Sequence, residues 1–207
     1  MSIPAHQITA LLLAGGQGSR MGGLDKGLQT FHGEPLALQV MRRVAPQAGA
    51  LLISANRHLD DYRRLGADVI TDELPGFHGP LAGIHAGLGH CKTPWMLTVP
   101  CDSPFLPAEL AHRLGSAIIA HGADLAYAVT GSGESRREHP VFCLMRVSLR
   151  DDLGRHLGSG ARKVREWQAR VASVAVPFDD EHAFRNLNTL ADLAAAQPDD
   201  TDRKSPR

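Results

Sequence analysis

The 207-residue chain lacks an excess of charge of either sign, because its 22 basic and 22 acidic side chains cancel. A neutral chain has no broad electrostatic attraction to nucleic acid or to a membrane surface, so any polyanion must be bound at a local site. The chain also has no apolar run that approaches the roughly 20 residues needed to cross a bilayer. Its N-terminus has no charged segment followed by a signal-type apolar core. We therefore expect a cytoplasmic protein with no nucleic-acid partner and no membrane partner.

Cysteine is scarce, with only Cys91, Cys101 and Cys143 in the chain. The number is odd, the spacing is wide and no Cys-x-x-Cys pair occurs, which argues against a disulfide framework and against a zinc site. We expect buried free thiols in a reducing compartment. With 43% hydrophobic and 21% charged residues, the chain has the composition of an ordinary globular protein and is long enough for one α/β core.

What the chain does have is a glycine-rich stretch near its N-terminus. An apolar run over residues 8–13 is typical of a buried strand, and Gly15, Gly16 and further glycines follow it. Glycine lets backbone N–H groups turn toward a ligand, and successive N–H groups in such a turn form a concave anion site. Arg20 and Lys26 add positive charge, so the stretch predicts a polyphosphate-binding loop.

Two better-known phosphate loops do not fit this stretch. The dinucleotide pattern G-x-G-x-x-G would begin at Gly16, but its last position is Met21. The P-loop needs Gly-Lys-Ser/Thr, whereas Lys26 lies between Asp25 and Gly27. On composition alone, an ordinary glycine-rich turn from strand to helix with solvated charges stays open as the alternative.

The order of elements predicts a Rossmann-like α/β fold. Strand, loop and helix alternate four times in the first half, which is the pattern of a parallel sheet with right-handed crossovers. Ligands bind beyond the carboxyl ends of such strands, so the strand-end residues should converge on one crevice. The second strand ends without the acidic residue that an NAD site prefers. The expected strands cover residues 8–13, 51–53, 68–70 and 95–99, and the strand-end residues are Gly15, Ser54, Asp72 and Asp102.

The second half continues the fold with less regular spacing. A polar loop is expected over residues 131–139, and a loop of this length between two strands is more often functional or mobile than a tight hairpin. Residues 1–197 are expected to form a single domain, and the polar residues 198–207 to be disordered. The expected strands cover residues 125–129, 141–145 and 171–176, and the expected helices cover residues 108–121, 149–157, 164–169 and a short stretch that ends at Ala196.

Two aspartates at strand ends are candidate ligands for a metal ion or a nucleotide. Asp102 follows a buried strand and would face the phosphate loop, where a carboxylate is a good ligand for Mg²⁺. The same residue could cap a helix that begins near Pro107, or hold a turn before Pro104. For Asp72 the residues alone favour a role in a turn. Position therefore leaves both interpretations of Asp102 open.

The full string around the glycine-rich stretch resembles a known signature. It is similar to the signature of nucleotidyltransferases that act on phosphorylated sugars and on molybdopterin, and most of all to that of the molybdenum cofactor guanylyltransferase family. The resemblance extends over residues 8–196 and implies a single, mostly parallel sheet flanked by helices, of the nucleotide-diphospho-sugar transferase type. The residues that carry it are Leu13-Ala14-Gly15-Gly16, Ser19-Arg20-Met21-Gly22-Gly23 and Asp25-Lys26-Gly27.

The resemblance implies specific roles in the N-terminal half. The loop would wrap the triphosphate, and Lys26 would neutralise charge as pyrophosphate leaves. Asp102 matches the aspartate of the family's metal-binding Pro-x-Asp-x-Pro. Ser54 stands where the family often has asparagine, so water or Asn56 would replace that contact. The implied catalytic residues are Lys26, Asp102 and Arg20; the implied nucleotide-binding residues are Leu13, Ala14, Gly15, Gly16, Lys26, Ser54, Asn56, Asp72 and Asp102; and Mg²⁺ would bind Asp102.

The C-terminal half is implied to hold the pterin. Arg162 and Lys163 lie in a stretch that matches the family and could bind a phosphate as cations, although a solvated helix face explains them equally well. Gly83 lies in a stretch that matches the family strongly, and simple helix capping is its alternative explanation. The implied pterin-binding residues are Gly83, His139, Arg162, Lys163, Asn186 and Asn188.

The implied reaction is transfer of GMP from GTP to the terminal phosphate of molybdopterin, with release of pyrophosphate. The same loop fits a nucleotidyltransferase for another acceptor, such as a CTP-dependent molybdopterin enzyme or a sugar-phosphate enzyme. A non-catalytic nucleotide-binding regulator is a third class, but Lys26 and Asp102 argue against it, since pure binding needs neither a leaving-group cation nor a metal carboxylate. We expect a monomer with GTP and the molybdenum cofactor as its partners, and transient contact with cofactor-insertion proteins.

Overall fold

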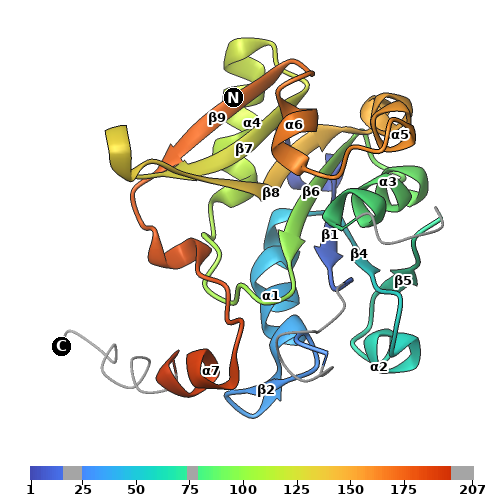
Figure 1. Cartoon of the computed structure of the whole chain (residues 1–207), viewed down its shortest axis with the longest axis vertical. Helices are drawn as coiled ribbons and strands as arrows, with labels where there is room; N and C mark the ends of the chain where they lie inside the picture. The colour runs from blue at the N-terminus through green and yellow to red at the C-terminus, as the bar shows by residue number, and fades with distance from the viewer. Residues whose placement is uncertain (16–24, 74–78, 197–207) are drawn as a thin grey trace.

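A seven-stranded sheet runs through the centre of the computed structural model, and helices cover both of its faces (Figure 1). The structure describes residues 1–15, 25–73 and 79–196. The strand order across the sheet is β5-β4-β1-β6-β8-β7-β9. In that order the strands span Asp68–Ile70, Ala50–Ser54, Ile8–Leu13, Trp95–Pro100, Arg137–Arg146, Leu125–Thr130 and Ser173–Phe178.

The sheet is parallel except around β8. Strand β1 pairs in parallel with β4 and β6, β4 pairs in parallel with β5, and β7 pairs in parallel with β9. Strand β8 is antiparallel to both of its neighbours, β6 and β7. The central parallel strands are nearly continuous apolar runs, as expected for strands that are covered on both faces. The predicted class, a mostly parallel sheet flanked by helices, is confirmed.

The helices divide between the two faces of the sheet. Within β1 the side chains alternate, so that Leu12 belongs to one apolar cluster and Leu11 to the other. The cluster of Leu12 is covered by α1 (Leu36–Val44), α2 (Leu59–Arg63) and α4 (Leu110–His121). The cluster of Leu11 is covered by α3 (Pro80–His90), α5 (Arg150–Gly158) and α6 (Val164–Gln168). Short 3-10 helices span Ala5–Gln7, Ala45–Gln47, Gly133–Ser135, Val147–Leu149 and His182–Phe184.

Strand β8 is longer than the sequence predicts. The predicted polar loop over residues 131–139 is wrong for its last three residues, because β8 already begins at Arg137. His139 pairs with Ala128 of β7, and the register then shifts between Ala128 and Tyr127. Residues 140–142 are the extra residues that this irregularity absorbs, so a polar start and an apolar end can belong to one strand.

The last strand, β9, covers Ser173–Phe178 where the sequence predicts residues 171–176. The backbone N–H groups of Asp124 and Leu125 both donate to the carbonyl of Ala172, at 2.8 and 3.2 Å. The pairing of β9 with β7 therefore starts only after this contact. Such a boundary depends on hydrogen bonds between segments far apart in the sequence, which no local pattern contains.

The end of the described chain packs against a hairpin near its beginning. Helix α7 (Leu190–Ala196) lies beside the hairpin formed by β2 (Thr30–Phe31) and β3 (Glu34–Pro35) (Figure 1). Leu193 and Phe31 belong to the same buried cluster. This packing holds α7 near the hairpin of residues 30–35. The predicted tail, residues 198–207, lies outside the described residues. Across the described ranges, no helix has the length and apolar character needed to cross a membrane.

Candidate active site

The carboxyl ends of the central strands meet at one edge of the sheet, which is the lower edge in Figure 1. The N–H of Ala14, just after β1, donates to the carbonyl of Ser54 at the end of β4 (2.8 Å). The N–H of Cys101, just after β6, donates to the carbonyl of Leu13 (3.1 Å). The segments that follow β1 and β6 therefore lie side by side, and Asp102 comes directly after Cys101.

Lys26 lies at this edge between residues from two distant parts of the chain. Its Nζ atom is 3.5 Å from Oδ2 of Asp102 and 2.5 Å from Oδ1 of Asn188. The side chains of Lys26 and Asp102 are 26% and 11% exposed, so solvent reaches the pair without fully hydrating it. Two of the three predicted catalytic residues are therefore adjacent, and the third, Arg20, lies outside the described residues.

The surroundings of Asp102 oppose its negative charge. Burial raises the pKa of its carboxyl above the ordinary value, and the Lys26 ammonium partly reverses this increase. Across the described ranges, no three His, Cys, Asp or Glu side chains come together as a metal site. Mg²⁺, however, is typically held by one or two carboxylates and completes its shell with substrate phosphates and water. Asp102 suits this pattern, because its side chain stands at the solvent-reached edge.

The C-terminal segment brings two of the predicted pterin residues to this cluster. Oγ of Ser103 donates to Oδ1 of Asn186 (2.7 Å), and the N–H of Leu187 donates to the carbonyl of Asp102 (2.8 Å). Asn188, which contacts the lysine, follows directly. The sequence motif indicates a ligand role for both asparagines. It does not predict that Asn188 contacts Lys26 or that Asn186 contacts Ser103 in the loop after β6.

Asn56 and Asp72 form a second polar pair at the same edge. Nδ2 of Asn56 donates to Oδ2 of Asp72 (2.8 Å), and the N–H of Asp72 donates to Oδ1 of Asn56 (2.9 Å). A β-carbon at Gly15 would lie 3.6 Å from Nδ2 of Asn56, so the start of the glycine-rich stretch passes this pair. Three predicted nucleotide-binding residues are therefore neighbours, while Gly16 lies outside the described residues.

Ser54 and Gly83 lie beneath the edge. Ser54 is buried, and a β-carbon at Gly83 would meet its Oγ at 2.5 Å and a methyl group of Leu13 at 3.0 Å. Helix α3 therefore approaches the ends of β1 and β4 so closely that only glycine fits. Packing accounts for both residues, and their contacts with a ligand stay predictions.

His139 lies on β8, away from the lysine. Its Nε2 is 2.9 Å from Oγ1 of Thr130, and its ring stacks on Phe184 with 4.6 Å between the centroids. Burial lowers the pKa of the imidazole below its ordinary value. The histidine belongs to an open hollow of about 530 Å³ that the sequence does not predict. The hollow is lined by Arg136, Arg137, Glu138, His139 and Arg165.

Arg162 and Lys163, which precede α6, are engaged locally. Nη1 of Arg162 donates to the carbonyls of Leu157 (3.3 Å) and Ala161 (3.0 Å). Lys163 forms an ion pair with Glu166 at 3.0 Å and its side chain is 78% exposed. The structure thus gives each cation a partner in its own segment, and their contact with a pterin stays a prediction.

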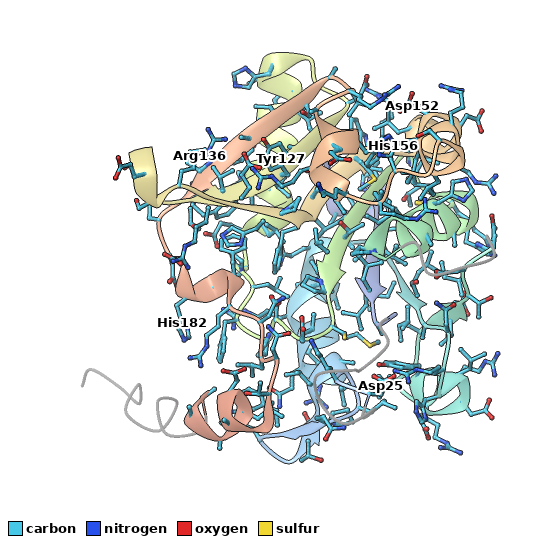
Figure 2. All side chains as sticks on the ribbon, in the orientation of Figure 1. Asp25, Tyr127, Arg136, Asp152, His156 and His182 are labelled. Carbon is cyan, nitrogen blue, oxygen red and sulfur yellow. The ribbon has the colours of Figure 1, made fainter. Side chains whose placement is uncertain are left out.

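Beside Lys26 lies a buried pair that the sequence does not predict. Tyr62 on α2 is fully buried, and its hydroxyl donates to Oδ1 of Asp25 (2.5 Å), which Figure 2 labels at the same edge. The same oxygen accepts the N–H of Gly27 (3.2 Å). The only signal in the sequence is an aromatic residue spaced three positions from Leu59 and Leu65 in an otherwise charged segment.

Comparison with known proteins bears on the class of this site. The family described as MobA-like NTP transferase domain matches residues 10–174, a range that includes Lys26, Asn56, Asp72 and Asp102. The chain belongs to this family. The predicted nucleotidyltransferase class is therefore confirmed for this MobA-like NTP transferase.

Curated relatives agree over nearly the whole chain. The chain is 55% identical over 192 residues to the molybdenum cofactor guanylyltransferase of Cupriavidus necator. The match covers 92% of this chain and 96% of that protein. It is 50% identical over 195 residues to the protein of the same name from Bordetella pertussis, with 94% and 99% covered. The predicted membership of the molybdenum cofactor guanylyltransferase family is confirmed.

Solved structures show the same fold. Molybdopterin-guanine dinucleotide biosynthesis protein A from Archaeoglobus fulgidus is 27% identical to this MobA-like NTP transferase, with a TM-score of 0.72 and 92% and 96% of the two chains covered. A 4-diphosphocytidyl-2C-methyl-D-erythritol synthase from Anaerococcus prevotii, 12% identical, shares the fold with a TM-score of 0.69 and 93% and 97% covered. The fold type predicted from the resemblance is therefore confirmed.

Proposed function

We propose that this chain transfers GMP from GTP to the terminal phosphate of molybdopterin and releases pyrophosphate. The observation that carries the proposal is the cluster of Lys26, Asp102 and Asn188 at the carboxyl edge of the sheet. A fixed cation next to a carboxylate suits a reaction in which charge moves between phosphates. Relatives that are 50–55% identical and named guanylyltransferases support GTP as the donor.

The transfer forms a bond between an oxygen of the acceptor phosphate and the α-phosphorus of GTP. It breaks the bond from that phosphorus to the bridging oxygen, which leaves with pyrophosphate. The acceptor phosphate is already an anion, so no strong general base is required, and catalysis consists of positioning and charge neutralisation. Arg20 and the backbone N–H groups of the glycine-rich stretch that begins at Gly15 would surround the triphosphate.

Lys26 would stabilise the charge that builds on the departing pyrophosphate. An ammonium group has three N–H donors. Asn188 and Asp102 lie within reach of two of them, at 2.5 and 3.5 Å, which leaves the third for a phosphate oxygen. The two neighbours therefore aim the lysine without exhausting its hydrogen-bonding capacity.

Asp102 would hold the divalent cation, for which we propose Mg²⁺. When bound, this ion would neutralise charge on the phosphates that it contacts. Asp102 would have to be ionised, and Lys26 favours that state, because its ammonium lowers the pKa that burial raises.

The polar pair of Asn56 and Asp72 would contact the nucleoside, since it offers an amide and a carboxylate beside the start of the phosphate loop. The pterin would extend from Asn186 toward β8 and the segment that precedes α6. His139, Arg162 and Lys163 would contact it there, at the positions that the family resemblance assigns to them.

The decisive experiment measures pyrophosphate release with each of the four NTPs, with and without molybdopterin, in the presence of Mg²⁺. We expect release with GTP that depends on molybdopterin. Sugar phosphates in place of molybdopterin should give none. Tighter binding of CTP than of GTP by calorimetry would contradict the choice of nucleotide, and release with sugar phosphates would contradict the choice of acceptor.

A further inference from the structure

We propose that Tyr62 is a positioning residue that holds Lys26 in place for the transfer step, an inference that rests on the proposed function. The lysine lies between two anchored neighbours. On one side, the Tyr62 hydroxyl donates to the carboxylate of Asp25 at 2.5 Å. On the other side, a β-carbon at Gly27 would lie 2.5 Å from the Tyr62 hydroxyl oxygen and 3.2 Å from Sγ of Cys101. Tyr62 thus constrains the residues before and after the lysine.

The backbone around Lys26 is pinned at further points. The N–H of Ala37, in α1, donates to the carbonyl of Gly27 (2.8 Å). The side-chain amide of Gln29 donates to the carbonyl of Asp25 (2.9 Å), and its N–H donates to the carbonyl of Lys26 (3.1 Å). The flexible part of the lysine is therefore only its side chain, whose tip is held by Asp102 and Asn188.

The charge of Asp25 supports a positioning role for the pair. A carboxylate repels the phosphates that the neighbouring lysine would attract, so the charge of Asp25 does not help an anion to bind. Asp25 therefore needs another explanation. Its side chain is buried and its Oδ1 accepts two hydrogen bonds, one from Tyr62 and one from Gly27. Hydrogen bonds to an ionised acceptor are about twice as strong as neutral ones. The carboxylate is thus used to fix the main chain.

Tyr62 keeps its proton under all ordinary conditions. Burial is the largest cause that raises the pKa of its phenol above the usual value, and the hydrogen bond to Asp25 and the charge of that carboxylate add to it. The hydroxyl therefore remains a donor to Asp25 throughout the pH range in which an enzyme works.

Tyr62 lies on a helix that follows the nucleotide side of the site. Helix α2 begins right after the loop that carries Asn56, and His58 at its start has a φ angle of 52°, in the left-handed region. Non-glycine residues adopt this conformation uncommonly, and histidine is among those enriched in it. Tyr62 lies in α2 one helical turn after this residue, in the segment that follows β4.

The test uses two tyrosine variants that remove the same atom. Tyr62→Phe removes only the hydroxyl that contacts Asp25, and Tyr127→Phe is the matched control on β7, far from Asp25 in Figure 2. We expect Tyr62→Phe to lower kcat for pyrophosphate release about 10-fold to 10²-fold, because small displacements of a catalytic group have effects of this size. The KM for GTP should stay within about 2-fold, and Tyr127→Phe should match the wild type.

A double variant separates positioning from general loss of structure. In a Lys26→Ala background there is no lysine to position, so adding Tyr62→Phe should lower kcat no further. A purely structural role would multiply the two effects. Equal fold-losses of kcat in the two backgrounds, or wild-type kcat in Tyr62→Phe, would overturn the proposal.

Asp25 provides the same test from the acceptor side, including the case in which Tyr62→Phe fails to fold. Asp25→Ala should lose kcat as Tyr62→Phe does, whereas Asp25→Asn should recover most of it, because the amide oxygen still accepts from Tyr62 and Gly27. Failure of the asparagine variant to recover kcat would contradict the positioning role. A wild-type protein that releases no pyrophosphate from GTP and molybdopterin would instead contradict the proposed function.

Discussion

Two lysines that the sequence predicts as phosphate-binding residues occupy different surroundings. The side chain of Lys26 is 26% exposed, and its Nζ contacts Asp102 and Asn188, which lie 76 and 162 positions further along the chain. The side chain of Lys163 is 78% exposed and pairs with Glu166, three positions further on. The first lysine is fixed by the tertiary structure, and the second only by its own helical turn.

The difference separates groups that act in the reaction from groups that act in binding. A charge that is fixed before the substrate arrives stabilises a transition state without reorganisation. An exposed, locally paired lysine contributes little to stability, and it must lose side-chain entropy when a ligand orders it. We therefore expect Lys26 to affect kcat, and the cations of the second half to affect the KM for the pterin substrate.

The largest expected effect is that of Lys26→Ala. Its kcat for pyrophosphate release should fall by about 10²–10³-fold, because a preorganised charge is lost at the leaving group. The matched control is Lys163→Ala, whose kcat should change by less than about 3-fold, because its ion pair is exposed. Steady-state kinetics with both substrates, at equal folded fractions by circular dichroism, measures the difference. Similar losses of kcat in the two variants would break the contrast between the two lysines.

Asp102→Asn should give the second-largest effect. The amide keeps the size of the carboxylate but lacks its charge and holds a divalent cation less tightly, so activity should fall on the order of 10²-fold at low Mg²⁺. The defect should shrink as Mg²⁺ is raised, if weakened binding of the ion is its main cause. Asp124→Asn, at an exposed ion pair with Arg146, is the control. A defect of the same size at every Mg²⁺ concentration would contradict the role of Asp102 as a ligand of the cation.

Arg162→Ala should affect the second region alone. We expect the KM for molybdopterin to rise about 5-fold, which corresponds to roughly 1 kcal/mol for an exposed charge, while the KM for GTP is unchanged. Arg155→Ala, which removes an exposed partner of Asp152 on α5, is the control. Weaker GTP binding with unchanged pterin kinetics would refute the division into a nucleotide half and a pterin half.

The smallest effect concerns the pH dependence of stability around His139. Burial holds its pKa in the folded state below the ordinary value of 6.5, so the unfolded chain binds this proton first as the pH falls. The contribution of this residue to the free energy of unfolding should be constant above pH 6.5 and decrease from there down to the lowered pKa. His139→Gln should flatten this decrease, with a difference in Tm of less than about 3 °C between pH 7.5 and 5.5. Parallel Tm profiles of the variant and the wild type would show that this histidine does not titrate as described.

The first half of the fold is predictable because each of its strands is a short apolar run that ends at a turn signal. Strand β8 is harder, because its first residues, including Arg137 and Glu138, are charged and their pairing with β7 passes through a bulge. Polar residues at the start of a strand resemble a loop in the sequence, and only the partner strand distinguishes the two.

The site follows the same rule. The proximity of Lys26 and Asp102 is predictable, because both follow parallel strands whose carboxyl ends share one edge. The contact of Lys26 with Asn188 is not predictable, since it depends on where a distant segment docks. Tyr62 escapes prediction for a related reason: its partner Asp25 lies 37 positions away, and a lone buried aromatic residue has the same pattern as any core residue.

Because Asn188 follows Lys26 by 162 positions, a chain that is still being translated cannot assemble the whole cluster. At the usual 5–20 residues per second, a ribosome adds this stretch in about 8 to 32 s, while the earlier strands are already able to pair. A nascent chain can therefore form its parallel sheet before it can act on a substrate. A product released before residue 186, for example at a nonsense codon, would carry the glycine-rich stretch without Asn188, which contacts Lys26, and without Asn186, which contacts Ser103. Activity of this kind reports that synthesis has passed residue 188.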